Sequence, residues 1–246
     1  MKMCADLAPV SLVPPSAGGR EASPWRLREL TVPDPFGVVV VVPGRGVAAE
    51  RYDWLGRAAN QARWAAVVVD GLYGDLDDRG GPRAYQAVRE VVSTRGGPVA
   101  VAGHSTGARV ALRAAADCPV AGAVALCPIA DLSDHVRRAA AFLPDYAAAV
   151  VADLGPPGSA AYDERSPLLW AAELTAPLLL VAAQEDRVCP PYQTTMLADA
   201  IRAAGGSPRV EVIRAAGHFF ERGAATASAE HEVGALLVSW LGGLTG

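Results

Sequence analysis

The sequence contains few of the residues that build metal sites and disulfide frameworks, and no apolar segment of membrane-spanning length. Its four cysteines are far apart and form no C-x-x-C pair: Cys4, Cys118, Cys127 and Cys189. Neither a zinc site nor a disulfide framework is therefore indicated. The longest apolar runs, 176–183 and 233–241, are shorter than the roughly 18 residues that a membrane span needs. The N-terminal stretch LAPVSLVPP is too short and too rich in proline for a signal peptide, so we expect a cytoplasmic protein.

A large excess of charge of either sign is also absent. The 22 basic residues face 26 acidic ones, which gives a net charge of −4. The longest basic tract is the pair Arg137-Arg138. Nucleic acids and anionic membranes bind surfaces with concentrated positive charge, so neither is expected as a partner. The length of 246 residues suits one α/β domain with a large core.

Short apolar runs alternate along the chain with segments of helical periodicity. Continuous runs of Val, Ala and Leu are typical of strands that are buried on both faces of a parallel sheet. The predicted strands are 25–32, 36–42, 65–70, 98–102, 120–127, 178–183 and 209–214, and the predicted helices are 50–63, 82–94, 106–116, 192–204 and 224–241. This alternation predicts a doubly wound, mostly parallel α/β sheet. Residues 1–22 are expected to form a loose leader before a single domain at 23–246.

The segment 129–167 is longer than a connection between two strands needs, and we expect it to add helices outside the sheet. Pro144 can begin a helix over 145–154. Apolar residues recur there every four positions: Phe142, Tyr146, Val150 and Leu154. The stripe either packs on the body of the domain or covers a substrate. In the second interpretation the segment is a cap, and Phe142, Tyr146 and Val150 are substrate-binding residues.

One serine lies in a motif that exposes nucleophiles. The stretch VAVAGHSTGARVAL places Ser105 between two glycines, after a predicted strand and before a predicted helix. In a G-x-S-x-G turn the glycines allow a sharp bend that holds the serine strained and exposed above the edge of the sheet. A hydroxyl is a weak nucleophile at neutral pH, so Ser105 needs a base, and the base needs an orienting acid.

His218 is the best placed of the four histidines to act as the base. It follows the last predicted strand at a glycine turn, in the stretch RAAGHFF, where its side chain can reach back to the serine. His104 lies inside the G-x-S-x-G turn, so its side chain should point away from Ser105 and pack. His135 lies in the 129–167 segment, and His231 lies in the last predicted helix among polar residues.

The acid is expected directly after strand 178–183, where Asp186 comes to the carboxyl edge of the sheet. The chain order Ser105, Asp186, His218 is the order of the α/β-hydrolase triad. Asp131, which follows the preceding strand, is the competing acid. Glu185 is adjacent to Asp186 but should face the opposite side.

The oxyanion needs two backbone donors. One should be the N–H of Thr106, directly after the nucleophile, and the other should come from Arg45 or Gly46 in the loop PGRG. The side chain of Arg45 has two interpretations. It is either solvated or paired with a local acid, such as Glu50 or Asp53, or it anchors a substrate carboxylate or phosphate.

Over nearly its whole length the chain resembles the α/β-hydrolase superfamily, and its second half is most similar to the catalytic domain of the prolyl oligopeptidase family and related esterases. The stretches YDERSPLLWAAELTAPLLLVAAQEDRVCPP and AGHFF carry the resemblance. GHSTGA is closer to esterases and lipases than to the family's peptidases, and PGRG has proline where many relatives have histidine. No propeller domain is expected before the hydrolase body. The resemblance therefore implies an α/β-hydrolase fold with a helical cap and a serine hydrolase, without favouring a peptidase.

The predicted function is cleavage of an ester or similar acyl bond through an acyl-enzyme. The expected substrate is a small acyl compound, and no metal or cofactor is expected. The alternatives are a thioesterase or cyclase that releases an acyl chain from a carrier protein, a small peptidase or amidase, and a non-catalytic binding protein of the same fold. Cys189 lies three positions from Asp186 and close to the expected site, but it does not occupy the G-x-S-x-G turn and is not the predicted nucleophile.

Overall fold

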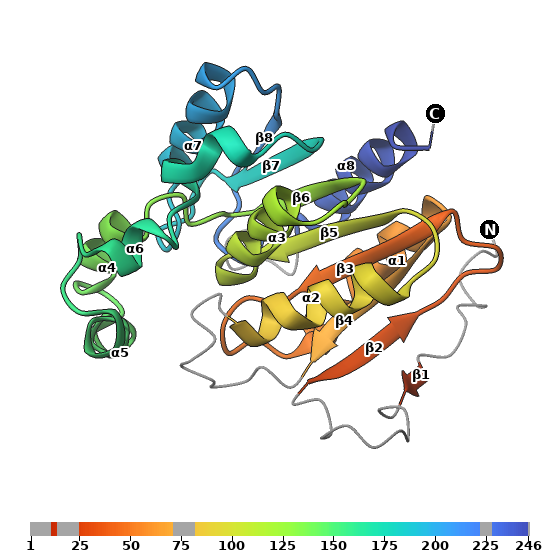
Figure 1. Cartoon of the computed structure of the whole chain (residues 1–246), viewed down its shortest axis with the longest axis horizontal. Helices are drawn as coiled ribbons and strands as arrows, with labels where there is room; N and C mark the ends of the chain where they lie inside the picture. Colours follow the sequence, from red (N-terminus) through yellow and green to blue (C-terminus); the bar gives the residue numbers. More distant parts are fainter. Residues whose placement is uncertain (1–10, 14–24, 71–81, 222–227, 246) are drawn as a thin grey trace.

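A mixed sheet of eight strands forms the centre of the computed structural model, which describes residues 11–13, 25–70, 82–221 and 228–245. The strands are β1 (Ser11–Val13), β2 (Arg26–Leu30), β3 (Gly37–Val42), β4 (Trp64–Asp70), β5 (Val99–His104), β6 (Gly122–Leu126), β7 (Leu178–Ala183) and β8 (Arg209–Ile213). They lie in the order β1-β2-β4-β3-β5-β6-β7-β8 (Figure 1). The pairs β1·β2 and β2·β4 are antiparallel and the other pairs are parallel. The predicted doubly wound, mostly parallel sheet is confirmed.

The central strands form where the sequence has unbroken apolar runs. All six residues of β3, GVVVVV, are buried, as are all of those in β5, β6 and β7. Each of the seven predicted strands is present. The eighth, β1, comes from the predicted leader and pairs with β2 through Leu12 and Arg28. Three residues give no periodic signal of their own, so this edge strand was not predicted. Residues 1–10 and 14–22 of the leader lie outside the described residues.

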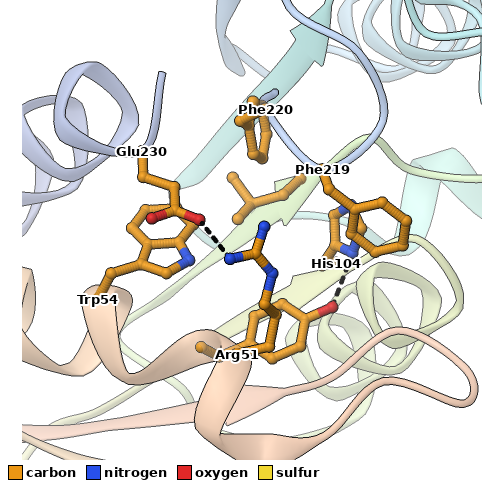
Figure 2. Close-up of a pocket in the computed structure, with 8 residues that line it drawn as sticks. Arg51, Trp54, His104, Phe219, Phe220 and Glu230 are labelled. Atoms are coloured by element: carbon orange, nitrogen blue, oxygen red, sulfur yellow. Dashed lines mark hydrogen bonds and ion pairs between the residues drawn. The ribbon is translucent and has the colours of Figure 1, made fainter. Parts of the chain in front are cut away.

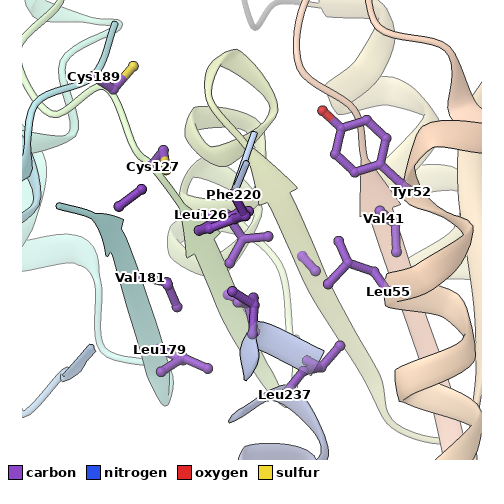
Figure 3. Close-up of a cluster of buried hydrophobic side chains, with 14 of the residues drawn as sticks. Val41, Tyr52, Leu55, Leu126, Cys127, Leu179, Val181, Cys189, Phe220 and Leu237 are labelled. Carbon is purple, nitrogen blue, oxygen red and sulfur yellow. The ribbon is translucent and has the colours of Figure 1, made fainter. Parts of the chain in front are cut away.

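Helices cover both faces of the sheet. They are η1 (Ala49–Tyr52), α1 (Asp53–Gln61), α2 (Pro82–Thr94), α3 (Thr106–Asp117), α4 (Leu132–Ala139), α5 (Pro144–Leu154), α6 (Ala160–Asp163), η2 (Pro167–Glu173), α7 (Pro191–Ala203) and α8 (Glu230–Gly243). Helices α1 and α8 pack on one face, in the cluster that includes Leu55, Leu126 and Leu237 (Figure 3). Helices α2, α3 and α7 pack on the other face. None of the described helices has the length and apolar character that crossing a membrane requires.

The predicted helical insertion is present between β6 and β7. Helices α4, α5 and α6 project together from one end of the molecule (Figure 1), and η2 leads the chain back to the sheet. The apolar stripe divides into two halves. Val150 and Leu154 are buried in the same cluster as Val136 and Tyr162, so they pack, and Val150 is not an open lining residue. Tyr146 is half-buried, and Phe142 is 42% exposed.

Candidate active site

Ser105 occupies the sharp turn between β5 and α3 that the motif predicts. Its backbone has φ 56° and ψ −117°, a left-handed conformation that costs a non-glycine residue conformational energy. The two glycines of the motif permit the tight approach of the flanking segments. A Cβ atom at Gly103 would lie 2.1 Å from the Gly107 carbonyl oxygen, and one at Gly107 would lie 2.2 Å from the Val42 carbonyl oxygen. Any side chain at either position would therefore push the helix away from the strands.

Asp186 and His218 form a buried hydrogen-bonded pair. His218 Nδ1 lies 2.7 Å from Asp186 Oδ2. The other carboxylate oxygen, Oδ1, accepts hydrogen bonds of 2.8 Å from the backbone N–H groups of Val188 and Cys189. An ionised carboxylate only accepts hydrogen bonds, so the proton of the pair is on Nδ1. In the neutral ring this leaves Nε2 as the basic nitrogen.

The competing acids are directed elsewhere. Asp131 caps the start of α4, where its Oδ1 accepts a hydrogen bond of 3.0 Å from the backbone N–H of Asp134. Glu185 is exposed, and its backbone N–H donates to the Ala216 carbonyl. Both placements agree with the choice of Asp186 from the sequence.

The hydroxyl of Ser105 lies beside a buried thiol. Its Oγ is 4.0 Å from Cys189 Sγ, and no hydrogen bond to His218 is present among the described residues. Such contacts are often long in a free enzyme and shorten when substrate binds. Burial raises the pKa of the Cys189 thiol, which disfavours the reactive thiolate. The buried thiol of Cys189 is therefore a neighbour of Ser105 that is itself poorly suited to act as a nucleophile.

His104 makes two hydrogen bonds that the sequence did not predict. Its Nδ1 is 2.8 Å from the hydroxyl of Tyr52, a bond drawn as a dashed line in Figure 2. Its Nε2 is 2.8 Å from the backbone carbonyl of His218. The Tyr52 oxygen in turn accepts the N–H of Gly44 at 2.9 Å. Packing, the predicted role of His104, is thus only part of what this side chain does.

The loop after β3 lies directly against Thr106. The N–H of Arg45 donates to Thr106 Oγ1 at 2.8 Å, so in the free protein one of the two predicted donors already has an acceptor. Gly46, the other candidate, is exposed in a turn with φ 69°. Of the two candidates, Arg45 is therefore the one whose N–H contacts the residue directly after Ser105.

The side chain of Arg45 contacts the helical insertion. Its guanidinium carbon lies 5.0 Å from the ring centre of Tyr146. Neither Glu50 nor Asp53 pairs with Arg45, because both of these acids bind Arg28. Asp53 forms two hydrogen bonds of 2.8 Å with Arg28, and Glu50 lies 3.7 Å from it.

Residues 83–244, more than half of the chain, match the sequence profile of the prolyl oligopeptidase family. The chain belongs to the prolyl oligopeptidase family. No curated protein sequence matches it. By its family and its fold, this chain is a serine hydrolase of the α/β-hydrolase class. The resemblance inferred from the sequence is confirmed.

Solved structures with the same fold include esterases, lipases and peptidases. A monoacylglycerol lipase from Paleococcus ferrophilus is 18% identical, with a TM-score of 0.66 over 89% of this chain and 99% of the lipase. A carboxylesterase from a metagenomic library is 20% identical, with a TM-score of 0.70 over 97% and 89%. A puromycin-hydrolysing peptidase from Mycobacterium tuberculosis is 20% identical, with a TM-score of 0.71. The match covers 96% of this chain and only 39% of that peptidase.

Arg109 is a residue near the site of this prolyl oligopeptidase-family chain that sequence reasoning missed. It lies one helical turn after Ser105 in α3 and is only 4% exposed. Its guanidinium donates to the Arg165 carbonyl at 3.4 Å. Its charge adds to burial in lowering the pKa of His135, and it opposes the burial that raises the pKa of Tyr146. The signal in the sequence was an arginine four positions after the serine, among the alanines and valines of a buried helix.

Three possible metal ligands lie together but already have other partners. His104, Cys127 and His218 offer ligand atoms within 4.8 Å of one another. Both nitrogens of His104 are hydrogen-bonded, and Nδ1 of His218 is held by Asp186. The thiol of Cys127 contacts the His218 carbonyl at 3.8 Å. The cluster is therefore explained by the hydrogen bonds of the site without a metal ion.

Two buried imidazoles predict how stability depends on pH. Burial lowers the pKa of His104 to about 3 and that of His135 to about 4. Below about pH 6.5 the unfolded chain therefore binds protons that the folded chain does not. We expect the free energy of unfolding to fall as the pH drops from 6.5 toward 4, by up to about 1.4 kcal/mol per pH unit for each imidazole.

Urea unfolding of the wild type, His135→Gln and His231→Gln at several pH values between 4.5 and 7.5 measures this. His135→Gln should have a shallower pH slope than the wild type. His231 is exposed, so His231→Gln is the matched control and should keep the wild-type slope. Equal slopes in all three proteins would contradict the assignment.

Proposed function

We propose that this chain hydrolyses an ester or a similar acyl bond through an acyl-enzyme on Ser105. The observation that carries the proposal is the 2.7 Å contact between His218 and the buried Asp186, next to a serine held in a strained turn. A site that only binds a ligand does not require a histidine whose protonated Nδ1 faces a desolvated carboxylate. A catalytic triad does require it, because Asp186 then stabilises the imidazolium that forms during the reaction.

The proposed reaction has two halves. His218 Nε2 removes the proton of Ser105 as Oγ attacks the acyl carbon, and then delivers that proton to the leaving oxygen as the original acyl bond breaks. Water next attacks the acyl-enzyme while His218 Nε2 takes its proton. The bond to Ser105 breaks, and the serine regains the proton as the acid product leaves.

Thr106 and Arg45 are the proposed oxyanion donors. The N–H of Thr106 is at the start of α3, where backbone N–H groups have no partner within the helix and carry partial positive charge. The N–H of Arg45 donates to the Thr106 hydroxyl in the free protein. We propose that the substrate oxyanion takes that hydrogen bond over, since a charged acceptor binds a donor more strongly than a hydroxyl does.

A fluorophosphonate probe tests the nucleophile. The wild type should be labelled at Ser105, and Ser105→Ala should lose both labelling and ester turnover while it stays folded, because the hydroxyl is the attacking group. Cys189→Ala is the matched control, since it alters a side chain 4.0 Å from the same oxygen, and it should keep most of the activity. Labelling that persists in Ser105→Ala, or an equal loss in Cys189→Ala, would refute the assigned roles.

Arg45 and Tyr146 are proposed to bind the substrate next to the reacting carbonyl. The backbone of Arg45 lies against Thr106, and its side chain lies over Tyr146. Because Arg28 binds the nearby acids, the Arg45 guanidinium can bind a carboxylate or phosphate of the substrate. An acidic acyl or leaving group is therefore the proposed preference.

Arg45→Ala should raise KM about 10-fold or more for an ester with a carboxylate on its acyl group, through loss of a charged hydrogen bond. It should change KM little for a neutral ester of the same length. Arg45→Lys, which keeps the charge but loses the planar fork, should give an intermediate value for the acidic ester. Steady-state kinetics on the matched ester pair measures this. Equal changes for both esters would leave Arg45 with a role in shaping the loop only.

The less buried part of the apolar stripe, Phe142 and Tyr146, is proposed to contact the acyl chain. Phe142→Ala and Tyr146→Ala should lower kcat/KM more for long or aromatic acyl esters than for acetyl esters, by about 1 to 3 kcal/mol of transition-state binding. Val150→Ala is the control, because Val150 is only 5% exposed, and it should lower Tm without changing chain-length preference. The same panel, with thioesters and aminoacyl amides added, separates an esterase from a thioesterase or a peptidase. A penalty that does not depend on chain length would make the whole stripe a packing surface.

A further inference from the structure

A chain of hydrogen bonds runs behind Ser105 from the loop after β3 to the loop that carries His218. It connects the N–H of Gly44, the hydroxyl of Tyr52, the ring of His104 and the backbone carbonyl of His218, with distances of 2.9, 2.8 and 2.8 Å. Tyr52 and His104 are 3% and 2% exposed. The bonds join residues that lie 8, 52 and 114 positions apart in the sequence.

The direction of each hydrogen bond follows from the chemistry of the groups. A carbonyl oxygen only accepts, so His104 Nε2 must carry the proton that is donated to His218. His104 is neutral, since burial and the nearby His218 lower its pKa to about 3. Its Nδ1 is therefore an acceptor, and the hydroxyl of Tyr52 donates to it. The Tyr52 oxygen accepts the N–H of Gly44, which completes one fixed arrangement.

The arrangement fixes the relative position of the two loops that serve the reaction. Gly44 adjoins Arg45, the proposed oxyanion donor, and His218 is the proposed base. His104 is bonded covalently to the nucleophile itself. The fit around Gly44 is close, because a Cβ atom there would lie 3.1 Å from His104 Nδ1 and 3.2 Å from the Tyr52 oxygen. A shift of either loop would therefore break at least one of the three bonds.

We infer that Tyr52 and His104 are positioning residues, which hold the oxyanion loop and the His218 backbone at fixed places around Ser105. The inference rests on the proposed function. Apolar side chains at both positions would fill the same space without burying a hydroxyl and two ring nitrogens. The rings around His104, among them Phe219 at 5.3 Å (Figure 2) and Tyr52 at 5.8 Å, supply packing contacts in addition to the hydrogen bonds.

Tyr52→Phe tests the inference, because it removes only the oxygen that joins Gly44 to His104. We expect kcat for a neutral ester to fall about 10- to 100-fold, as for a catalytic group displaced by a fraction of an ångström, with KM changed by less than about threefold. The affinity for phenylboronic acid, which forms a tetrahedral adduct on the serine, should fall with kcat. Tyr85→Phe is the matched control, since its hydroxyl donates to Asp117 on the surface, and it should keep both values.

A second pair of variants keeps the test decisive if Tyr52→Phe does not fold. His104→Gln retains a donor for the His218 carbonyl, whereas His104→Leu does not, so Gln should preserve more of kcat than Leu at equal thermal stability. Wild-type kcat and boronic-acid affinity in Tyr52→Phe, or equal activity of Gln and Leu, would overturn the inference and leave the network a purely structural role.

A spectroscopic measurement separates this inference from the proposed function. The chain has only four histidines, so spectra of protein labelled with ¹⁵N-histidine can be assigned. His104 should be protonated at Nε2 alone down to about pH 4 in the wild type, whether or not the protein is active. A different tautomer of His104 would refute the network. A correct tautomer without labelling of Ser105 by the fluorophosphonate would instead refute the proposed function.

Discussion

The left-handed backbone of Ser105 is the constraint on which the rest of the site depends. It reverses the chain between β5 and α3, so that three consecutive side chains point to different parts of the molecule. His104 reaches back to Tyr52 and the His218 loop, whereas Thr106 accepts the N–H of Arg45. Ser105 itself is held by its own N–H, which donates to Leu126 at 2.9 Å. The strain in one residue is offset by hydrogen bonds made by that residue and its two neighbours.

The surroundings of the serine favour neutral groups, and this determines how the site can respond to charge. His104 is neutral, and burial raises the pKa values of the Cys127 and Cys189 thiols. Asp186 is the buried carboxylate of the proposed triad, and two N–H groups stabilise its charge. In such a medium a positive charge on His218 would be stabilised chiefly by Asp186. Burial thus makes the effect of this one carboxylate larger than it would be in water.

The sequence was sufficient for the seven longer strands of the sheet and for the turn at Ser105, because each of these has a local signal. It also places Asp186 at the edge of the sheet, where the structure has it beside His218. The periodicity of apolar residues, the glycines of the turn and the ends of the strands can all be recognised within a few neighbouring residues of the sequence. The partners of Tyr52 and His104 are not, because those bonds join residues 52 and 114 positions apart. The binding of Asp53 by Arg28 was missed for the same reason. No repeat or motif marks an arginine on β2 as the partner of a carboxylate on α1.

The helical insertion shows why periodicity alone does not assign a role to an apolar residue. A spacing of four places Tyr146, Val150 and Leu154 on one side of α5, with Phe142 just before the helix, but only Val150 and Leu154 of these residues are buried. Val150 and Leu154 are buried in one cluster with residues of α4 and α6, whereas Tyr146 packs half-buried against that cluster and also contacts Arg45. The side chain of Arg45 contacts the insertion, and its backbone N–H donates to Thr106. A ligand that drew the guanidinium away from Tyr146 would act on the same residue whose N–H is the proposed oxyanion donor, so the proposed binding and catalytic roles belong to one position of the chain.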